Sequence, residues 1–121
     1  MDILNTATSV LNTALDVADR LKANIEVTYR HAVPGRRPEF LFSNTGDHEA
    51  SNLVVTADHP VNFQPCDGRT ECRIPVLYAG QRDYSVVFIP CFGHDVEALT
   101  LSVSYSDGTG RREVNRIVPL R

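Results

Sequence analysis

The stretch LTLSVSYSDGTGRREVNRIVPL, residues 99–120, decides the fold class of this chain. Over residues 99–105 an apolar residue alternates strictly with a serine or threonine, which is the period of a half-buried β-strand. Residues 107–110, Asp-Gly-Thr-Gly, are a turn sequence of the kind that joins two antiparallel strands. Residues 111–120 then return as a second strand, so this part of the chain is predicted to be a β-hairpin.

The returning strand of this hairpin has an irregular pattern. Val114 and Val118 share one face. Arg112 and Arg116 fall on that same face, and Ile117 points the other way. This arrangement predicts a bulged strand or an edge strand, and an unprotected edge can accept a strand from a partner.

Upstream of the hairpin, the two-residue period appears again in shorter segments. Turn-forming Gly, Pro, Asn and Asp residues separate these segments, and no helical pattern lies between them. Seven short strands arranged in this way favour an antiparallel immunoglobulin-like β-sandwich over a parallel βαβ sheet. Before the hairpin, the predicted strands cover residues 25–30, 40–42, 50–57, 74–78 and 83–89, and residues 59–68 are predicted to be loop.

Residues 2–23 differ from the rest, because they contain no Gly or Pro and their apolar residues repeat with a helical period. The apolar stripe is broader than the two-position seam of a coiled coil. We therefore predict an amphipathic helix over residues 1–24 and a sandwich over residues 25–121. The stripe residues predicted to make an interaction are Leu4, Ala7, Val10, Leu11, Ala14, Val17, Ala18 and Leu21.

With Ile3 and Leu15 beside it, this stripe carries seven large apolar side chains, and burying them would contribute on the order of 10 kcal/mol. The seven are Ile3, Leu4, Val10, Leu11, Leu15, Val17 and Leu21. The stripe must therefore pack against protein, and two possibilities remain. It packs against the chain's own sandwich, or against a helix from another copy or from a partner protein. A membrane-surface helix is disfavoured, because Arg20 and Lys22 are the only cations of the segment. We predict a non-catalytic protein-interaction or assembly module in which the helix mediates self-association or docking.

Three cysteines and one histidine provide the alternative prediction, a metal-stabilised or small-ligand-binding domain. Cys66 and Cys72 are separated by five residues, and His94 follows Cys91 by three positions. These are zinc-ligand residue types, although the first spacing is wider than usual. The same first pair could form a disulfide in an oxidising compartment, or all three thiols could be unlinked.

No sequence pattern supports catalysis, phosphate binding or a basic binding patch, so we expect no enzyme activity and no cofactor. Cys91, His94 and Asp95 are close in sequence but have no surrounding oxyanion-hole signature. The glycines at 108 and 110 join two strands and do not open a helix, which argues against phosphate binding. The arginine pairs at 36–37 and 111–112 have acidic neighbours, and solvated charge is the simpler interpretation.

The composition indicates which class of partner and which cellular compartment to expect. Twelve basic and fifteen acidic residues give a formal net charge of -3, which argues against a general nucleic-acid binder. The N-terminal segment lacks a basic signal-peptide region, and its polar interruptions exclude a membrane span. We therefore expect a cytoplasmic protein with a protein partner, or with itself as the partner.

Five segments carry a resemblance to known domains: residues 42–46, 50–55, 77–80, 84–88 and 103–111. Their order resembles that of the bacterial immunoglobulin-like and fibronectin type III-like accessory domains, including the CARDB-like group. The resemblance covers about residues 25–120 and implies the sandwich fold, with no catalytic residues. Those domains are usually extracytoplasmic parts of larger chains and do not require a leading helix, so this chain departs from them in both respects.

Overall fold

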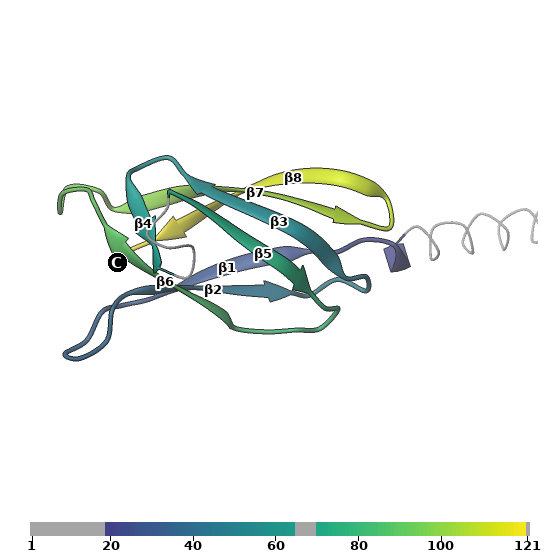
Figure 1. Cartoon of the computed structure of the whole chain (residues 1–121), viewed down its shortest axis with the longest axis horizontal. Helices are drawn as coiled ribbons and strands as arrows, with labels where there is room; N and C mark the ends of the chain where they lie inside the picture. Colours follow the sequence, from purple (N-terminus) through teal and green to yellow (C-terminus); the bar gives the residue numbers. More distant parts are fainter. Residues whose placement is uncertain (1–18, 65–69, 121) are drawn as a thin grey trace, which may run out of the picture.

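Two four-stranded antiparallel sheets pack face to face in the computed structural model, which describes residues 19–64 and 70–120 (Figure 1). One sheet has the order β1-β2-β6-β4, and the other has the order β5-β3-β7-β8. The architecture confirms that the chain is mainly β and forms an antiparallel sandwich. The strands are β1 (Ile25–Arg30), β2 (Glu39–Asn44), β3 (Ala50–Ala57), β4 (Val61–Phe63), β5 (Glu71–Leu77), β6 (Tyr84–Pro90), β7 (Ala98–Asp107) and β8 (Gly110–Pro119).

Strand β4 corrects the seven-strand prediction, which assigned residues 59–68 to loop. It pairs antiparallel with the end of β6, with Val61 opposite Pro90 and Phe63 opposite Phe88. Val61 and Phe63 are both buried in the core. Three residues are too few to show a period, so burial of these two side chains, and not a local pattern, forms the strand.

The core lies between the sheets, and Phe40 is at the centre of its aromatic part. Phe40 is fully buried, and its ring stacks on that of Phe88 with a centroid distance of 4.1 Å and an interplanar angle of 6°. Phe42 and Phe63 contact the same ring at 6.5 and 6.3 Å. The facing sheet supplies the alternating apolar residues of β7, which are all buried as their period predicts: Leu99, Leu101, Val103 and Tyr105.

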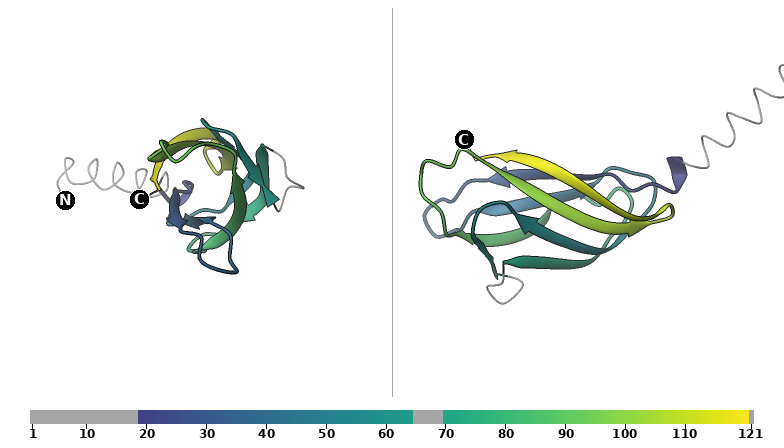
Figure 2. Two further views of the ribbon diagram at one scale, coloured as in Figure 1. Left: turned by 90° about the vertical axis from the view of Figure 1, so that its left-hand side faces the viewer. Right: turned by 90° about the horizontal axis from the view of Figure 1, so that it is seen from above.

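Strands β1 and β8 are edge strands of opposite sheets, and a side chain joins them. The ribbons of β1 and β8 run beside each other (Figure 2). Arg116 Nε donates a hydrogen bond to the carbonyl oxygen of Ile25 at 2.8 Å, which joins the two sheets on this side. The edge position predicted for the last strand is confirmed. Its pairing with β7 runs without a register shift, so no bulge lies there. The bulge is in β3 instead, between Ser51 and Val54, where Asn52 has a φ of 51°.

The turns of the sandwich gather at its two ends (Figure 1). At the N-terminal end, the chain enters β1 beside the β2–β3 turn and the β7–β8 turn. At the opposite end, which we call the distal end, lie the β1–β2 turn, the β6–β7 loop and Leu120. Ten residues of β7 run between the two ends, a length of about 33 Å.

Candidate functional site

Residues 21–24 are fixed to the N-terminal end by two turns of the sandwich, and we call these four residues the anchor segment. In the β7–β8 turn, the Gly108 N–H donates to the Leu21 carbonyl oxygen at 2.8 Å. In the β2–β3 turn, the N–H groups of Asp47 and His48 both donate to the Lys22 carbonyl oxygen at 3.1 Å. The two turns therefore hold the anchor segment from both sides.

In the second half of the anchor segment, side chains accept hydrogen bonds from the backbone N–H groups of both residues. The Ala23 N–H donates to Asp107 Oδ2 at 3.0 Å, and the Asn24 N–H donates to Asn44 Oδ1 at 3.1 Å. The Asn24 carbonyl oxygen accepts a hydrogen bond from the Thr45 N–H at 2.9 Å. These bonds connect the anchor segment to both sheets, because Asn44 ends β2 and Asp107 ends β7.

Two glycines allow this close approach. A Cβ atom at Gly46 would lie 2.6 Å from both the Asn24 nitrogen and the Lys22 carbonyl oxygen. A Cβ atom at Gly108 would lie 2.9 Å from the Cβ and Cδ2 atoms of Leu21. No side chain fits at these distances, so both turns need glycine to contact the anchor segment.

The conformation of the anchor segment shows that the end of the predicted helix, which was expected to cover residues 1–24, was wrong. Among the described residues, α-helical conformation is confined to Asp19 and Arg20. The helix cannot continue, because the turns of the sandwich bind the backbone groups of residues 21–24. Leu21, one of the predicted interaction residues, lies against Gly108 and is 39% exposed. The other seven lie outside the described residues: Leu4, Ala7, Val10, Leu11, Ala14, Val17 and Ala18.

Asp107 is the charged group that holds the anchor segment. Its burial alone would raise its pKa, but hydrogen bonds from the Thr109 hydroxyl and from the N–H groups of Ala23 and Thr109 lower the pKa overall. Arg112 adds a smaller effect in the same direction, with its Nη1 atom 3.9 Å from Asp107 Oδ2. Asp107 is therefore an ionised acceptor that joins the anchor segment to the β7–β8 turn.

We expect Asp107→Asn to lower the free energy of unfolding by about 2 kcal/mol at pH 7, because an amide offers one acceptor oxygen where the carboxylate offers two. A carboxyl group with a lowered folded-state pKa stabilises the fold above its unfolded pKa of about 3.9, and this contribution is lost as pH falls through the folded value. The difference between variant and wild type should therefore shrink below about pH 4. Urea unfolding at several pH values measures it, and Glu113→Gln on the same hairpin is the control. A difference that does not change with pH would contradict this role.

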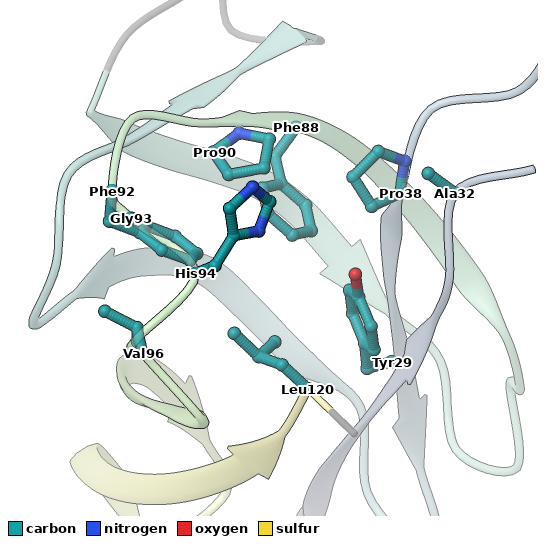
Figure 3. A pocket seen from close by; sticks show the side chains of 10 residues that line it. All are labelled: Tyr29, Ala32, Pro38, Phe88, Pro90, Phe92, Gly93, His94, Val96 and Leu120. Atoms are coloured by element: carbon teal, nitrogen blue, oxygen red, sulfur yellow. The ribbon is translucent and has the colours of Figure 1, made fainter.

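A cavity of about 490 Å³ opens at the distal end (Figure 3). Phe88 and Pro38 are buried in its floor, and Tyr29 and Phe92 stand on opposite sides of it. A volume of this size is typical of pockets that bind small ligands or peptide side chains. The lining residues are Tyr29, Ala32, Pro38, Phe88, Pro90, Phe92, Gly93, His94, Val96 and Leu120.

The polar side chains of the cavity lining are those of Tyr29 and His94. Burial raises the pKa of Tyr29, so its hydroxyl is a neutral hydrogen-bond donor at physiological pH. Two further histidines contact its aromatic walls. The ring of His31 packs edge-on against Tyr29 at 4.7 Å, and the ring of His59 packs against Phe92 at 6.0 Å.

The sequence pattern missed this cavity, although one signal pointed to it. Tyr29 and Phe88 are apolar residues near the ends of β1 and β6, and each is followed by a turn that contains a histidine or a proline. Both strands are antiparallel to β2, so their ends meet at the same end of the sandwich. Strand order, which the sequence alone does not provide, was needed to bring them together.

The residues of the predicted metal site are not brought together where the structure describes them. Cys72 is buried in the core, Cys91 is exposed after β6, and His94 lines the distal cavity. Within residues 19–64 and 70–120, no group of three or more His, Cys, Asp or Glu side chains could hold a metal ion. Cys66 lies outside the described residues, so its pairing with Cys72 stays a prediction.

The arginine pairs make specific contacts inside the molecule. Arg111 Nη1 donates to the Asn52 carbonyl oxygen at the β3 bulge at 2.8 Å. Arg37 Nη1 donates to Gln64 Oε1 at 2.8 Å.

In the part of the chain that is described, no helix has the length and apolar character that crossing a membrane requires.

Comparison of the chain with protein-family models, with curated proteins and with solved structures finds no match.

Proposed function

We propose that this chain is a non-catalytic protein-interaction module in which a rigid sandwich carries an apolar N-terminal segment that associates with further copies of the chain. The observation that supports the proposal most directly is the anchor segment. Its backbone is bonded to two turns, so the position at which residues 1–18 join the sandwich is fixed. A fixed attachment suits a segment that must meet a partner in one orientation, because less conformational entropy is lost on binding.

The proposed family is that of the immunoglobulin-like and fibronectin type III-like domains. Strand order supports it: β1, β2, β6 and β4 correspond to strands A, B, E and D, and β3, β7 and β8 correspond to C, F and G. Strand β5 extends the second sheet beside β3. It follows β4 in the chain, whereas the extra strand of that fold precedes strand D.

The remaining parts of the proposal follow from residue chemistry. We propose a cytoplasmic location and no resident cofactor. We also propose that the partner is not a nucleic acid, in keeping with the acidic net charge of -3. The second candidate function, a domain that binds a small ligand, is favoured by one observation, the aromatic cavity at the distal end.

The test of self-association is the mass of the full chain in solution. Leu11→Asp places a charge on the apolar stripe and should reduce the mass from a multiple of 13.4 kDa to 13.4 kDa. Asn12→Asp places the same charge one residue along, on the polar face, and should leave the mass unchanged. Light scattering at several concentrations measures both.

Two results would contradict the proposal. If the unaltered chain has a mass of 13.4 kDa at every concentration, the segment does not mediate self-association. If Leu11→Asp leaves the mass unchanged but lowers the melting temperature, the stripe packs against its own sandwich, which is the intramolecular alternative.

A further inference from the structure

Backbone hydrogen bonds hold the walls of the distal cavity in place. The Phe88 N–H donates to the Pro38 carbonyl oxygen at 3.2 Å, which joins β6 to the segment before β2. The Leu120 N–H donates to the Glu97 carbonyl oxygen at 2.9 Å, which joins the segment after β8 to the β6–β7 loop. Because Phe88, Pro38 and Leu120 all line the cavity, its shape is set by the fold and does not depend on a ligand.

Two groups of aromatic rings end at the cavity, one on each side. On the first side, Phe40, Phe88 and Tyr29 form a continuous series, with centroid distances of 4.1 Å between the first two rings and 6.1 Å between the last two. On the other side, Phe92 packs against His59 at 6.0 Å. The cavity separates Tyr29 from Phe92 (Figure 3). A further ring placed there would join the two groups into one series.

We propose that the distal cavity binds a phenolic ring between Tyr29 and Phe92, a proposal that rests on the second candidate function. The two side chains offer faces and edges against which a third ring packs. The Tyr29 hydroxyl is among the lining groups and donates a hydrogen bond to the phenolic oxygen. A free phenolic compound and the tyrosine side chain of a partner protein both carry this chemistry.

The alternative ligand is aliphatic, because Val96 and Leu120 also line the cavity. Removal of apolar surface from water does not distinguish the two classes, since it depends on area alone. Packing of ring against ring adds a preference that an aliphatic ligand lacks. Here the rings of Tyr29 and Phe92 stand on opposite sides of the cavity, so one flat ligand contacts both. The geometry therefore favours the aromatic class.

The experiment is a titration of the full chain with phenol, followed by two-dimensional NMR at pH 7, where the hydroxyls of phenol and Tyr29 are both neutral. Phenol should shift the amide signals of Phe92, Gly93 and Val96 in a saturable way. Cyclohexanol has the same size and hydroxyl without the aromatic ring, and it should bind about fivefold more weakly. Benzene lacks the hydroxyl and should also bind more weakly than phenol.

A pair of tryptophan substitutions shows that phenol occupies this cavity. Ala32 is exposed in the β1–β2 turn and lines the cavity, so Ala32→Trp should fill it and abolish the saturable shifts. Val33, the next residue, is 47% exposed in the same turn and is not a lining residue. Val33→Trp should therefore keep the wild-type affinity for phenol.

Two further variants assign the roles of the ring and the hydroxyl. Phe92→Leu removes one aromatic wall, so the preference for phenol over cyclohexanol should decrease. A ratio of affinities is the readout, because a general disturbance of the fold weakens both probes alike. Tyr29→Phe keeps the ring without the hydroxyl, so phenol should bind no more tightly than benzene, and the affinity for benzene should stay unchanged.

The source of the phenolic ring is found by comparing phenol with the capped tripeptide acetyl-Gly-Tyr-Gly-amide. Tighter binding of the peptide assigns the tyrosine of a partner protein. Equal or weaker binding assigns a free phenolic compound.

Three outcomes overturn the proposal: no saturable shifts at the cavity, equal binding of cyclohexanol and phenol, or wild-type affinity in Ala32→Trp. None of them changes the mass measured for self-association. The proposal and the proposed function can therefore fail separately.

Discussion

Replacing Asn44 by alanine is expected to lower the free energy of unfolding by about 4 kcal/mol, a large share of the stability of a domain of this size. Asn44 is fully buried at the end of β2. Its Oδ1 atom accepts hydrogen bonds from the N–H groups of Asn24 and Gly46 at 3.1 and 3.0 Å. Its Nδ2 atom donates to the carbonyl oxygens of His48 and Leu77 at 2.9 and 3.0 Å. Alanine would remove the hydrogen-bond partner that Asn44 provides to four backbone groups.

Chemical denaturation measures this effect, and Asn44→Asp shows which half of the amide matters. Aspartate keeps the acceptor but places a second oxygen against two carbonyl oxygens, so we expect a loss comparable to that of alanine. Asn115→Ala, on the exposed face of β8, is the control and should change stability by less than about 1 kcal/mol. A small effect of Asn44→Ala would mean that the turns hold the anchor segment without it.

The second large effect is expected for Phe40→Ala, at about 4 kcal/mol. The ring of Phe40 stacks on Phe88 and contacts Phe63 and Tyr29, so its removal leaves a cavity between the two sheets. Phe88 also forms the floor of the distal cavity. Loss of its stacking partner should therefore disturb this part of the cavity as well as the fold.

Thermal unfolding measures the loss of stability, with two comparison variants. Phe40→Leu retains most of the buried volume and should cost less than half as much as alanine. Val33→Ala, at a position that is 47% exposed in the β1–β2 turn, should be nearly neutral. Equal losses for Phe40→Leu and Phe40→Ala would indicate that stacking geometry, and not filled volume, sets the cost.

The sequence predicted those parts of the fold in which a local pattern reflects burial. In β7, each apolar residue over 99–105 faces the core and each serine or threonine faces outward, so the period alone identifies the strand. The 107–110 turn and the start of β1 at Ile25 are likewise local features. Strand β4 could not be found in this way, because only Val61 and Phe63 mark it and their burial depends on β6.

The candidate sites were harder to predict, because both depend on contacts between distant segments. The anchor segment ends a pattern that reads as helical through Ala23. It is redirected by Asp107, 84 positions away, and by the turn after Asn44. In the same way, the distal cavity combines residues from β1, β6 and the end of the chain that only strand order brings together. Propensity and spacing carry no information about such contacts.

The separation of the two ends has a consequence for any assembly that forms through residues 1–18. The sandwich places about 33 Å of β-sheet between its attachment point and the distal cavity. Copies that gather through their first residues would hold their cavities on the outside, each open to solvent. Such an array would bind a multivalent target with a higher overall affinity than a single copy does, although no single cavity makes a new contact.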